Sequence, residues 1–386
     1  MNRKQKMAQL ATELQTRLRG RLPSDRIHVK PGGKDVAILC PETGSELSQL
    51  LSTARELHLL LKGPNTRRAA GKFYVNLNLN RLSRILDLDE SSRCVTVQSG
   101  VALDSLEQWL NIHGWTLGWI HSGLEQHTVA EILQSSLPTF PSPRYTDPMK
   151  SVRGYRGVLP SGGELWNKTA PSRATGPDLL GMFCGGIELG VLTRVVFSVH
   201  PIPSSATIAE VTTTSPKDLL SLAGLESRCP HAPHRILVYK APQQRRKKQR
   251  WKLIVAWNDY EAAAQQFADR ARFRGLEANI RNGCDTKALE SYAPRSDCFF
   301  AGLMGKLPDA LITQMEQSTA RWVIGFKNAH ELQLWPHPED ATDSDDVVQT
   351  WFQHRANEAQ EHLGKLRKEL ISSLTKNAEN PSRESV

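Results

Sequence analysis

The sequence has few aromatic residues, few cysteines and no long hydrophobic run among its 386 residues. Lys or Arg interrupts each apolar run well before the length that crosses a bilayer, which argues against a transmembrane helix. The start is basic, but residues 8–22 alternate polar and apolar positions and lack the apolar core of a secretory signal. With 39% hydrophobic residues, the chain is expected to be a two-lobed cytoplasmic protein, with peripheral association at the inner face of the membrane as an alternative.

Metal-binding spacings are also missing. The six cysteines contain no CxxC pair, so neither a zinc knuckle nor an iron–sulfur cluster has its usual ligand spacing. Four later histidines are not at ligand-like spacing either: His330, His337, His354 and His362. We therefore expect reduced thiols and no metal site.

Positive charge is in excess, with a formal net charge of +9. Its densest run, "QQRRKKQRWK" at 243–252, separates the apolar stretches "RILVYK" and "WKLIVAW", which predicts a hairpin with a basic tip. Such a tip is either a solvated turn or a docking surface for an acidic partner subunit or an anionic membrane. Because no nucleic-acid-binding motif is present, specific nucleic-acid recognition is not expected.

Hydrophobic periodicity predicts alternating helices and strands. A helix is expected over 7–22, and strand, helix and strand over 36–40, 45–57 and 57–63 suggest a βαβ unit. Strands at 85–89 and 93–100 precede a helix at 103–113. After Pro203 the alternation restarts and predicts a small α+β sandwich, with strands at 236–240, 251–257, 276–280, 297–304 and 321–326 and helices at 260–274 and 308–316. Residues 347–374 are helical in pattern, and the final residues are polar and expected to be disordered.

The turn "KGPNTRRAAG" at 62–71 follows an apolar strand and carries three cations. Gly63 permits a close backbone approach, Asn65 tolerates a left-handed conformation, and Thr66 offers a hydroxyl to an anion. Pro64 opposes this role because it removes one N–H donor. From these residues alone, an ordinary type I turn and an anion-binding turn both remain open.

A wider set of motifs resembles a known family. The set comprises "ILCPETG", "KGPNT", the Leu/Ile/Asp pattern at 79–89, "VTVQSGV" at 95–101, "LPSGGEL", "RATGPDLLGMFCGG" and "LGVLTRVVFSVHPIP". Together these segments, over about residues 30–205, resemble the FAD-binding (PCMH-type) domain of the vanillyl-alcohol-oxidase flavoproteins, or FAD-linked oxidases. Length and loop style are most similar to the FAD-binding subunit of bacterial glycolate oxidase, whereas "ATGPDL" is shared with the alkyl-dihydroxyacetone-phosphate synthase branch.

The resemblance implies an α+β fold: a PCMH-type FAD-binding domain of two α+β subdomains, a ferredoxin-like α+β cap domain and a C-terminal helix. The implied division is 1–30 (N-terminal helix), 31–205 (FAD-binding domain), 206–340 (cap domain) and 341–386 (C-terminal helix and disordered tail).

The cofactor that the resemblance implies is non-covalently bound FAD. The residues it assigns to the cofactor are Gly63, Pro64, Asn65, Thr66, Thr128, Ser135, Ser136, Gly190, Val191 and Thr193. Ser135 and Ser136 could equally cap a turn. Arg173 could contact an anionic substrate or could form a surface salt bridge. The aromatic string at 109–121 could stack on the flavin or could simply pack, and no catalytic residue can be assigned.

The chain also departs from the family pattern. Where the family has Thr-x-Gly-Gly, this sequence has Thr128-Val129-Ala130-Glu131, and the carboxylate would repel a pyrophosphate unless Arg144, Arg153 or Arg156 compensates it. The following region, "SSLPTFPSPRYTDP", contains three prolines and predicts a stiff loop. A histidine-rich cap motif and the C-terminal family signature are not recognisable.

Three functional hypotheses follow. The first is an FAD-dependent oxidoreductase subunit of a glycolate or D-lactate (2-hydroxy-acid) oxidase complex, which would pass electrons to partner subunits. The second is a non-catalytic interaction subunit that keeps the fold but has lost FAD. The third is a stand-alone oxidase or synthase that uses Arg173 as an anion clamp. We favour the first over the second, because the helix-plus-hairpin surface and the high basicity suit a member of a complex.

Overall fold

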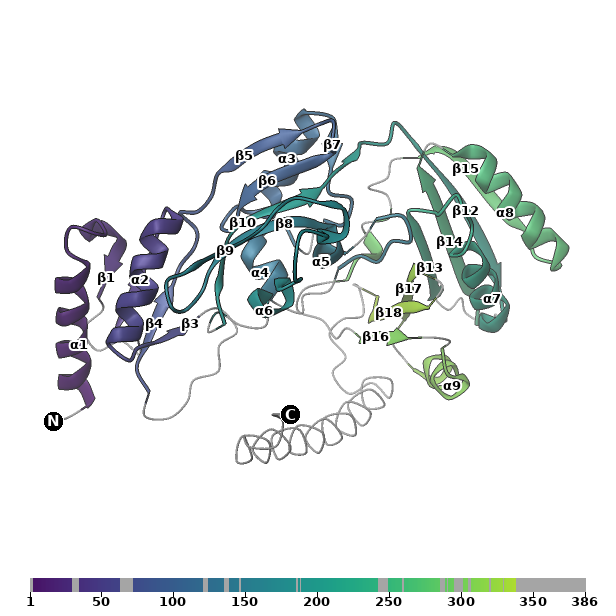
Figure 1. Ribbon diagram of the computed structural model, residues 1–386. Helices are drawn as coiled ribbons and strands as arrows, with labels where there is room; N and C mark the ends of the chain where they lie inside the picture. The colour runs from purple at the N-terminus through teal and green to yellow at the C-terminus, as the bar shows by residue number, and fades with distance from the viewer. Residues whose placement is uncertain are drawn as a thin grey trace, which may run out of the picture.

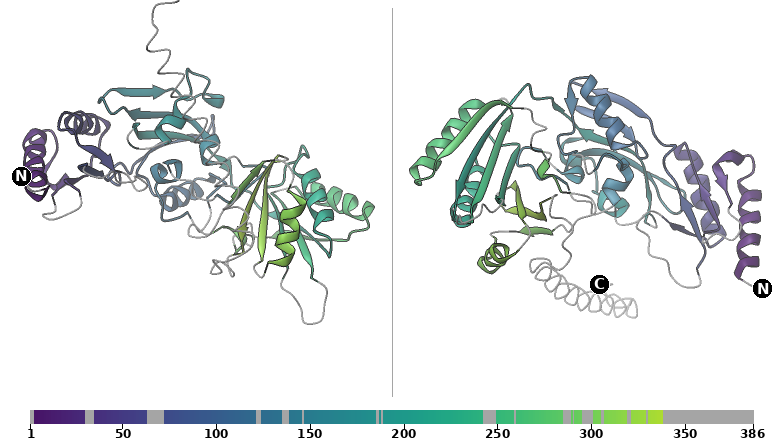
Figure 2. Two further views of the ribbon diagram at one scale, coloured as in Figure 1. Left: turned by 90° about the horizontal axis from the view of Figure 1, so that it is seen from below. Right: turned by 180° about the vertical axis from the view of Figure 1, so that it is seen from behind.

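The computed structural model describes most of the chain up to residue 337 as a succession of three large β-sheets with helices packed on them and one two-stranded ribbon (Figure 1). The described residues are 3–29, 35–62, 72–120, 124–134, 139–145, 147–184, 187, 189–241, 249–258, 260–284, 289, 291–294, 301–304, 307–318, 321–328 and 330–337. Figure 2 shows the same succession from below and from behind. Within these residues, no helix is both long and apolar enough to cross a bilayer.

The N-terminal sheet has the strand order β1-β2-β4-β3, and β4 runs parallel to both β2 and β3. Its strands are β1 (Ile27–His28), β2 (Ala37–Leu39), β3 (Leu60–Lys62) and β4 (Tyr74–Leu77), and its helices are α1 (Arg3–Leu18) and α2 (Gly44–Glu56). Thr43 caps α2 by accepting a hydrogen bond from the Glu46 N–H. The apolar face of α2 is buried, so the expected βαβ unit is present, with β4 inserted between its two strands.

The second sheet is antiparallel, with the order β5-β6-β10-β8-β9. Its strands are β5 (Ile85–Asp89), β6 (Cys94–Gln98), β8 (Val152–Val158), β9 (Glu164–Asn167) and β10 (Val191–Ser198). The helices around it are α3 (Leu103–Ile112), α4 (Val129–Gln134), α5 (Pro148–Ser151) and α6 (Leu180–Cys184). The strands β7 (Trp115–Thr116) and β11 (His200–Pro201) pair as a two-stranded antiparallel ribbon. The short 3-10 helices are η1 (Ser24–Arg26) and η2 (Pro171–Arg173).

The third sheet has seven strands in the order β15-β12-β14-β13-β17-β18-β16. They are β12 (Ala206–Thr213), β13 (Arg235–Lys240), β14 (Trp251–Asn258), β15 (Ala278–Cys284), β16 (Ala301–Met304), β17 (Trp322–Asn328) and β18 (Glu331–Pro336). The helices α7 (Pro216–Glu226), α8 (Glu261–Phe273) and α9 (Asp309–Gln317) pack into one apolar core with this sheet. The first four strands and two helices follow the β-α-β-β-α-β order of the ferredoxin-like fold.

The structure confirms a mixed α+β fold and corrects its details. The small sandwich expected after Pro203 is a larger sheet, because β17, β18 and β16 extend it beyond the ferredoxin-like core. The N-terminal helix spans Arg3–Leu18 instead of 7–22. The predicted hairpin is present, with Lys240 opposite Trp251, but most of its basic tip and the tail at 347–374 lie outside the described residues.

A proline-rich segment between α4 and β8 packs against the third sheet. We call residues 139–145 and 147–151 the strap. Phe140 is buried against Trp335, with their ring centroids 6.2 Å apart, and the Tyr145 hydroxyl accepts a hydrogen bond from Asn258 Nδ2 at 2.8 Å. The strap therefore covers part of the sheet face that α7 and α8 leave open.

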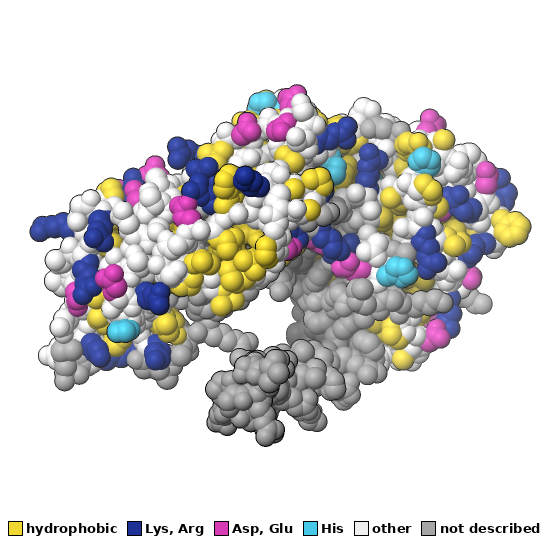
Figure 3. All heavy atoms as spheres, in the orientation of Figure 1, with side chains coloured by type: hydrophobic (Ala, Val, Ile, Leu, Met, Phe, Trp, Pro, Cys, Tyr) yellow, Lys and Arg dark blue, Asp and Glu magenta, His cyan; other side chains and the backbone are white. Residues whose placement is uncertain are grey.

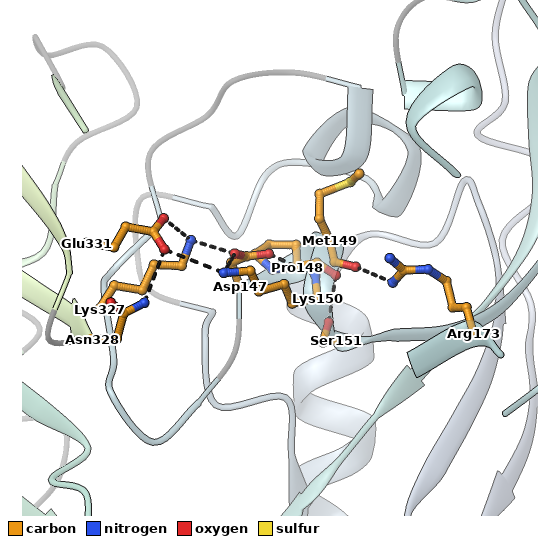
Figure 4. A network of polar contacts seen from close by, with 9 residues as sticks. All are labelled: Asp147, Pro148, Met149, Lys150, Ser151, Arg173, Lys327, Asn328 and Glu331. Atoms are coloured by element: carbon orange, nitrogen blue, oxygen red, sulfur yellow. Dashed lines mark hydrogen bonds and ion pairs between the residues drawn. The ribbon is translucent and has the colours of Figure 1, made fainter. Parts of the chain in front are cut away.

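Ion pairs fasten the end of the strap to the β17–β18 hairpin (Figure 4). Lys327 Nζ lies 2.5 Å from Asp147 Oδ2 and 2.7 Å from Glu331 Oε1, and Lys150 Nζ lies 3.5 Å from the other oxygen of Glu331. Burial alone would raise the pKa of Asp147, but its hydrogen bonds to Lys327 and to the Lys150 N–H outweigh burial and lower it. The two sheets are thus joined by both apolar and ionic contacts.

Candidate functional site

A cavity of about 320 Å³ lies where the parallel strands of the N-terminal sheet end. Its walls come from the ends of β3 and β4, from β2 and from α4. The lining residues are Ile38, Lys62, Asn76, Leu77, Asn78, Leu79, Asn80, Thr128, Ala130, Glu131, Gln134 and Ile187. The crevice outside the carboxyl ends of parallel strands is the usual ligand site of open α/β sheets, so this cavity is the candidate site.

The strand wall of the cavity is polar but mostly neutral. Asn76, Asn78 and Asn80 line it, and the Oδ1 atom of Asn78 accepts a hydrogen bond from the Asn80 N–H at 2.9 Å. Lys62 brings a positive charge, which pairs with Asp35 at 3.5 Å. Sequence reasoning missed these asparagines, although their alternation in "VNLNLN" places them two residues apart, as expected for side chains on one face of a strand.

The helix wall carries a carboxylate at the beginning of α4. The Thr128 hydroxyl accepts a hydrogen bond from the Glu131 N–H at 3.3 Å, and Glu131 Oε2 accepts one from the Thr128 N–H at 2.9 Å. These reciprocal bonds form a capping box. His127 Nδ1 lies 3.6 Å from the same carboxylate oxygen. Glu131 thus folds back over the helix terminus, where an anionic ligand would otherwise be attracted.

The remaining N–H groups of this turn are also engaged within the chain. The Val129 N–H donates to the Val101 carbonyl at 2.9 Å, and the Ala130 N–H donates to the Ser99 carbonyl at 2.7 Å. The four consecutive N–H groups from Thr128 to Glu131 therefore all have acceptors in the protein. The position of the cavity suits a dinucleotide, but the first turn of α4 does not fit a diphosphate, since its donors are used and a carboxylate lies beside them.

Several predicted cofactor residues lie outside the described residues, namely Gly63, Pro64, Asn65, Thr66, Ser135 and Ser136. The segment of the first four begins directly after Lys62, which lines the cavity. Thr128 also lines the cavity, and its hydroxyl caps α4. The assignment of these residues to a cofactor remains a prediction.

The turn at 190–193 lies behind the cavity rather than in its lining. Val191 is fully buried and belongs to the same apolar cluster as the lining residues Ala130 and Ile187. Thr193 donates its hydroxyl hydrogen to the Arg156 carbonyl at 3.1 Å. Gly190 has a φ of 154°, and a Cβ there would lie 2.6 Å from the Phe183 ring. None of these three residues lines the cavity, and their assignment to the cofactor remains a prediction.

Arg173 is held by acceptors of the protein (Figure 4). Its guanidinium pairs with Asp178 at 2.6 Å and donates to the carbonyls of Met149 and Val152 at 3.0 and 3.1 Å. These contacts agree with the salt-bridge alternative, and a contact of Arg173 with an anionic substrate remains a prediction. Arg156, one of the arginines considered as a partner of Glu131, pairs with Glu164.

The other candidate groups pack into the structure. Trp119 is buried, and its ring meets Phe197 edge-on at a centroid distance of 5.7 Å, which agrees with the packing alternative for the aromatic string. Among the described residues, no group of three or more His, Cys, Asp or Glu side chains could hold a metal ion.

Comparison with known proteins gives one family match and several relatives over part of the chain. Residues 36–167 match the family model described as "FAD binding domain". A putative mitochondrial D-lactate dehydrogenase of Schizosaccharomyces pombe is 28% identical over 185 residues, 46% of this chain and 35% of the relative. Mitochondrial D-2-hydroxyglutarate dehydrogenase of Arabidopsis thaliana is 28% identical over 213 residues, 51% of this chain and 36% of the relative. The matched part thus spans about a third of these relatives.

Solved structures resemble the chain over a longer stretch. A structure of alkyldihydroxyacetonephosphate synthase superposes with a TM-score of 0.65 at 14% identity and covers 85% of this chain and 79% of its own. A structure of p-cresol methylhydroxylase with substrate bound gives a TM-score of 0.61 at 11% identity, with 90% and 85% covered. The chain therefore shares the mixed α+β fold of these solved structures, and its residues 36–167 match the FAD binding domain family.

Proposed function

We propose that this chain is an FAD-binding subunit of an oxidoreductase complex that acts on a 2-hydroxy acid of the glycolate or D-lactate type. The single observation that carries the proposal is the cavity at the carboxyl edge of β2, β4 and β3, whose lining residues, apart from Ile187, lie within the segment that matches the FAD binding domain. Relatives named as D-lactate and D-2-hydroxyglutarate dehydrogenases support the substrate class. In this proposal the chain supplies the cofactor domain and partner subunits accept the electrons.

The direct test is the visible absorption spectrum of the purified chain before and after FAD is added and excess FAD is removed. A retained flavin spectrum that bleaches with a 2-hydroxy acid supports the proposal. A colourless protein that retains no FAD under either condition contradicts it.

A second candidate is a subunit of the same kind of complex that keeps the fold without the cofactor. The capping box of α4 favours this candidate, because Glu131 lies where the family has glycine and the neighbouring N–H groups are already bonded. It predicts a stable, folded protein that assembles with its partners and takes up no FAD.

Exposed apolar side chains support a role in a complex for either candidate. Hydrophobic side chains gather around β9 and α6 (Figure 3), where Trp166 is 67% exposed and Leu189 is 45% exposed. Exposed apolar patches frequently mark protein–protein contacts. We propose this surface as a contact with a partner subunit in the cytoplasm or at the inner face of the membrane. Cross-linking from a photoreactive residue at position 166 tests it.

A further inference from the structure

A cluster of arginines lies where the strap meets β11, apart from the cavity. The Tyr145 ring lies between Gly118, where a Cβ would be 2.6 Å from the ring, and His200, whose ring centroid is 4.9 Å away. The Tyr145 hydroxyl is fixed by Asn258. The preceding residue, Arg144, donates to the Asn258 carbonyl at 3.4 Å. Tyr145 therefore fixes the backbone of Arg144 beside His200.

Two further arginines approach the same histidine from the second sheet. The Arg93 carbonyl accepts a hydrogen bond from the Val199 N–H at 2.9 Å, which places Arg93 one residue from His200. Arg93 has a φ of 52°, a left-handed conformation that costs free energy in a non-glycine residue. Arg153 is in β8, whose neighbouring residues Val152 and Gly154 pair with Phe197 and Val196 of β10. Three separate segments thus bring one arginine each to this place.

The three arginines of this cluster have no ion-pair partner in the described part of the chain. Other arginines of the second sheet have carboxylate partners, since Arg156 pairs with Glu164 and Arg173 pairs with Asp178. No carboxylate of the described residues forms an ion pair with Arg93, Arg144 or Arg153.

The half-buried histidine responds to this excess of positive charge. Burial and then the positive charges of Arg144, Arg153 and Arg93 lower the pKa of His200 to about 4. The pKa of His234 is also lowered, first by burial and then by Arg235, with Arg144 contributing as well. The imidazoles are therefore neutral near pH 7, and the arginines carry the charge of the cluster.

We propose that Arg93, Arg144 and Arg153 form a binding site for a small oxyanion, such as a phosphate or dicarboxylate group, beside His200. Guanidinium groups bind carboxylate and phosphate oxygens through paired, charge-assisted hydrogen bonds. A bound oxyanion supplies the ion-pair partner that the described part of the chain does not give these arginines. This site is separate from the cavity, so it does not depend on whether FAD binds.

The pKa of His200 reports whether an anion binds beside it. Its pKa is measured by NMR on histidine-labelled full-length protein, with the resonance assigned from His200→Gln, in the presence of inorganic phosphate, oxalate or sodium chloride at matched ionic strength. We expect phosphate or oxalate to raise the pKa by about one unit, a tenfold change in proton affinity, because the anion offsets the neighbouring charges. Chloride should shift it much less.

Variants separate a site from general screening. Arg144→Gln and Arg93→Gln should each weaken oxyanion binding at least about fivefold, as expected for the loss of one charge-assisted contact. Arg272→Gln should leave it unchanged, since Arg272 is exposed on α8 and pairs with Asp269. An equal response to chloride, no response of His200 to either probe, or an unchanged affinity in both cluster variants would overturn the proposal. If a variant fails to fold, the wild-type comparison of oxyanions with chloride decides alone.

Discussion

Glu131→Gln tests how the cavity treats a dinucleotide. The substitution removes the negative charge at the beginning of α4, and the amide oxygen can still accept the hydrogen bond of the Thr128 N–H. The capping geometry is therefore retained while the repulsion of a diphosphate is lost.

The expected gain follows from the exposure of the side chain. The Glu131 side chain is 34% exposed, so a water-like dielectric is appropriate, and one pair of unit charges 4 Å apart then interacts by about 1 kcal/mol. One or two phosphate charges near the carboxylate give roughly 1–2 kcal/mol, or about a 5- to 30-fold tighter binding of FAD. The gain should shrink as salt rises, because the Debye length is only about 8 Å at physiological ionic strength.

Titration calorimetry or flavin fluorescence at low and high salt measures this effect. Gln134→Glu is a matched control, because it adds a carboxylate to the same helix wall and should weaken binding. Wild type and Glu131→Gln binding FAD with equal affinity at low salt would refute the reasoning, since the carboxylate would then not face the diphosphate. If neither protein binds FAD, the second candidate function is favoured.

Three further predictions concern stability and are checked by urea or thermal unfolding. Lys240→Met should lower the free energy of unfolding by about 2–3 kcal/mol, because the buried ammonium donates to the carbonyls of Met315, Glu316 and Ser318 at the end of α9; an unchanged urea midpoint would contradict this. The contribution of Asp147 to the free energy of unfolding should be present above about pH 4 and be lost as pH falls through its lowered pKa, because protonation breaks the pair with Lys327. The Lys327→Met variant should lose less stability on acidification than the wild type, and identical acid profiles would argue against the pair. Gly100→Ala should destabilise the protein by roughly 1–3 kcal/mol or more, since its Cβ would overlap the Leu79 carbonyl, and wild-type stability would disprove that close approach.

Local patterns predicted only some of the elements around the candidate site, since the strands β2 and β3 were expected whereas β4 and α4, which also line the cavity, were not. The strand and helix at 85–89 and 103–113 were predicted within one residue of β5 and α3, because their apolar periodicities are clear and Gly and polar residues flank them. The strands β8 and β10 were not predicted from periodicity. Both are central strands of the second sheet, and β8 contains two glycines that pack closely, one of them beneath Phe183.

The candidate site could be predicted only in part. The departure at Ala130-Glu131 was visible in the sequence, but its consequence depends on contacts between distant segments, since the carbonyls of Ser99 and Val101 engage the first turn of α4. The same limit applies to Arg144 and Arg153. They were considered as partners of Glu131, and the fold brings both near His200.

The strap has a consequence for dividing the chain into pieces. A fragment that stops near residue 205 would retain Phe140 and Tyr145 but lose the Trp335 and Asn258 surfaces on which they rest. It would also leave Asp147 without its ion-pair partner Lys327. The complementary fragment, from about residue 206 onward, would expose Trp335 and Leu237 to water. Expression of either half alone should therefore give aggregation, so the natural unit for biochemistry includes both sheets and the proline-rich stretch that bridges them.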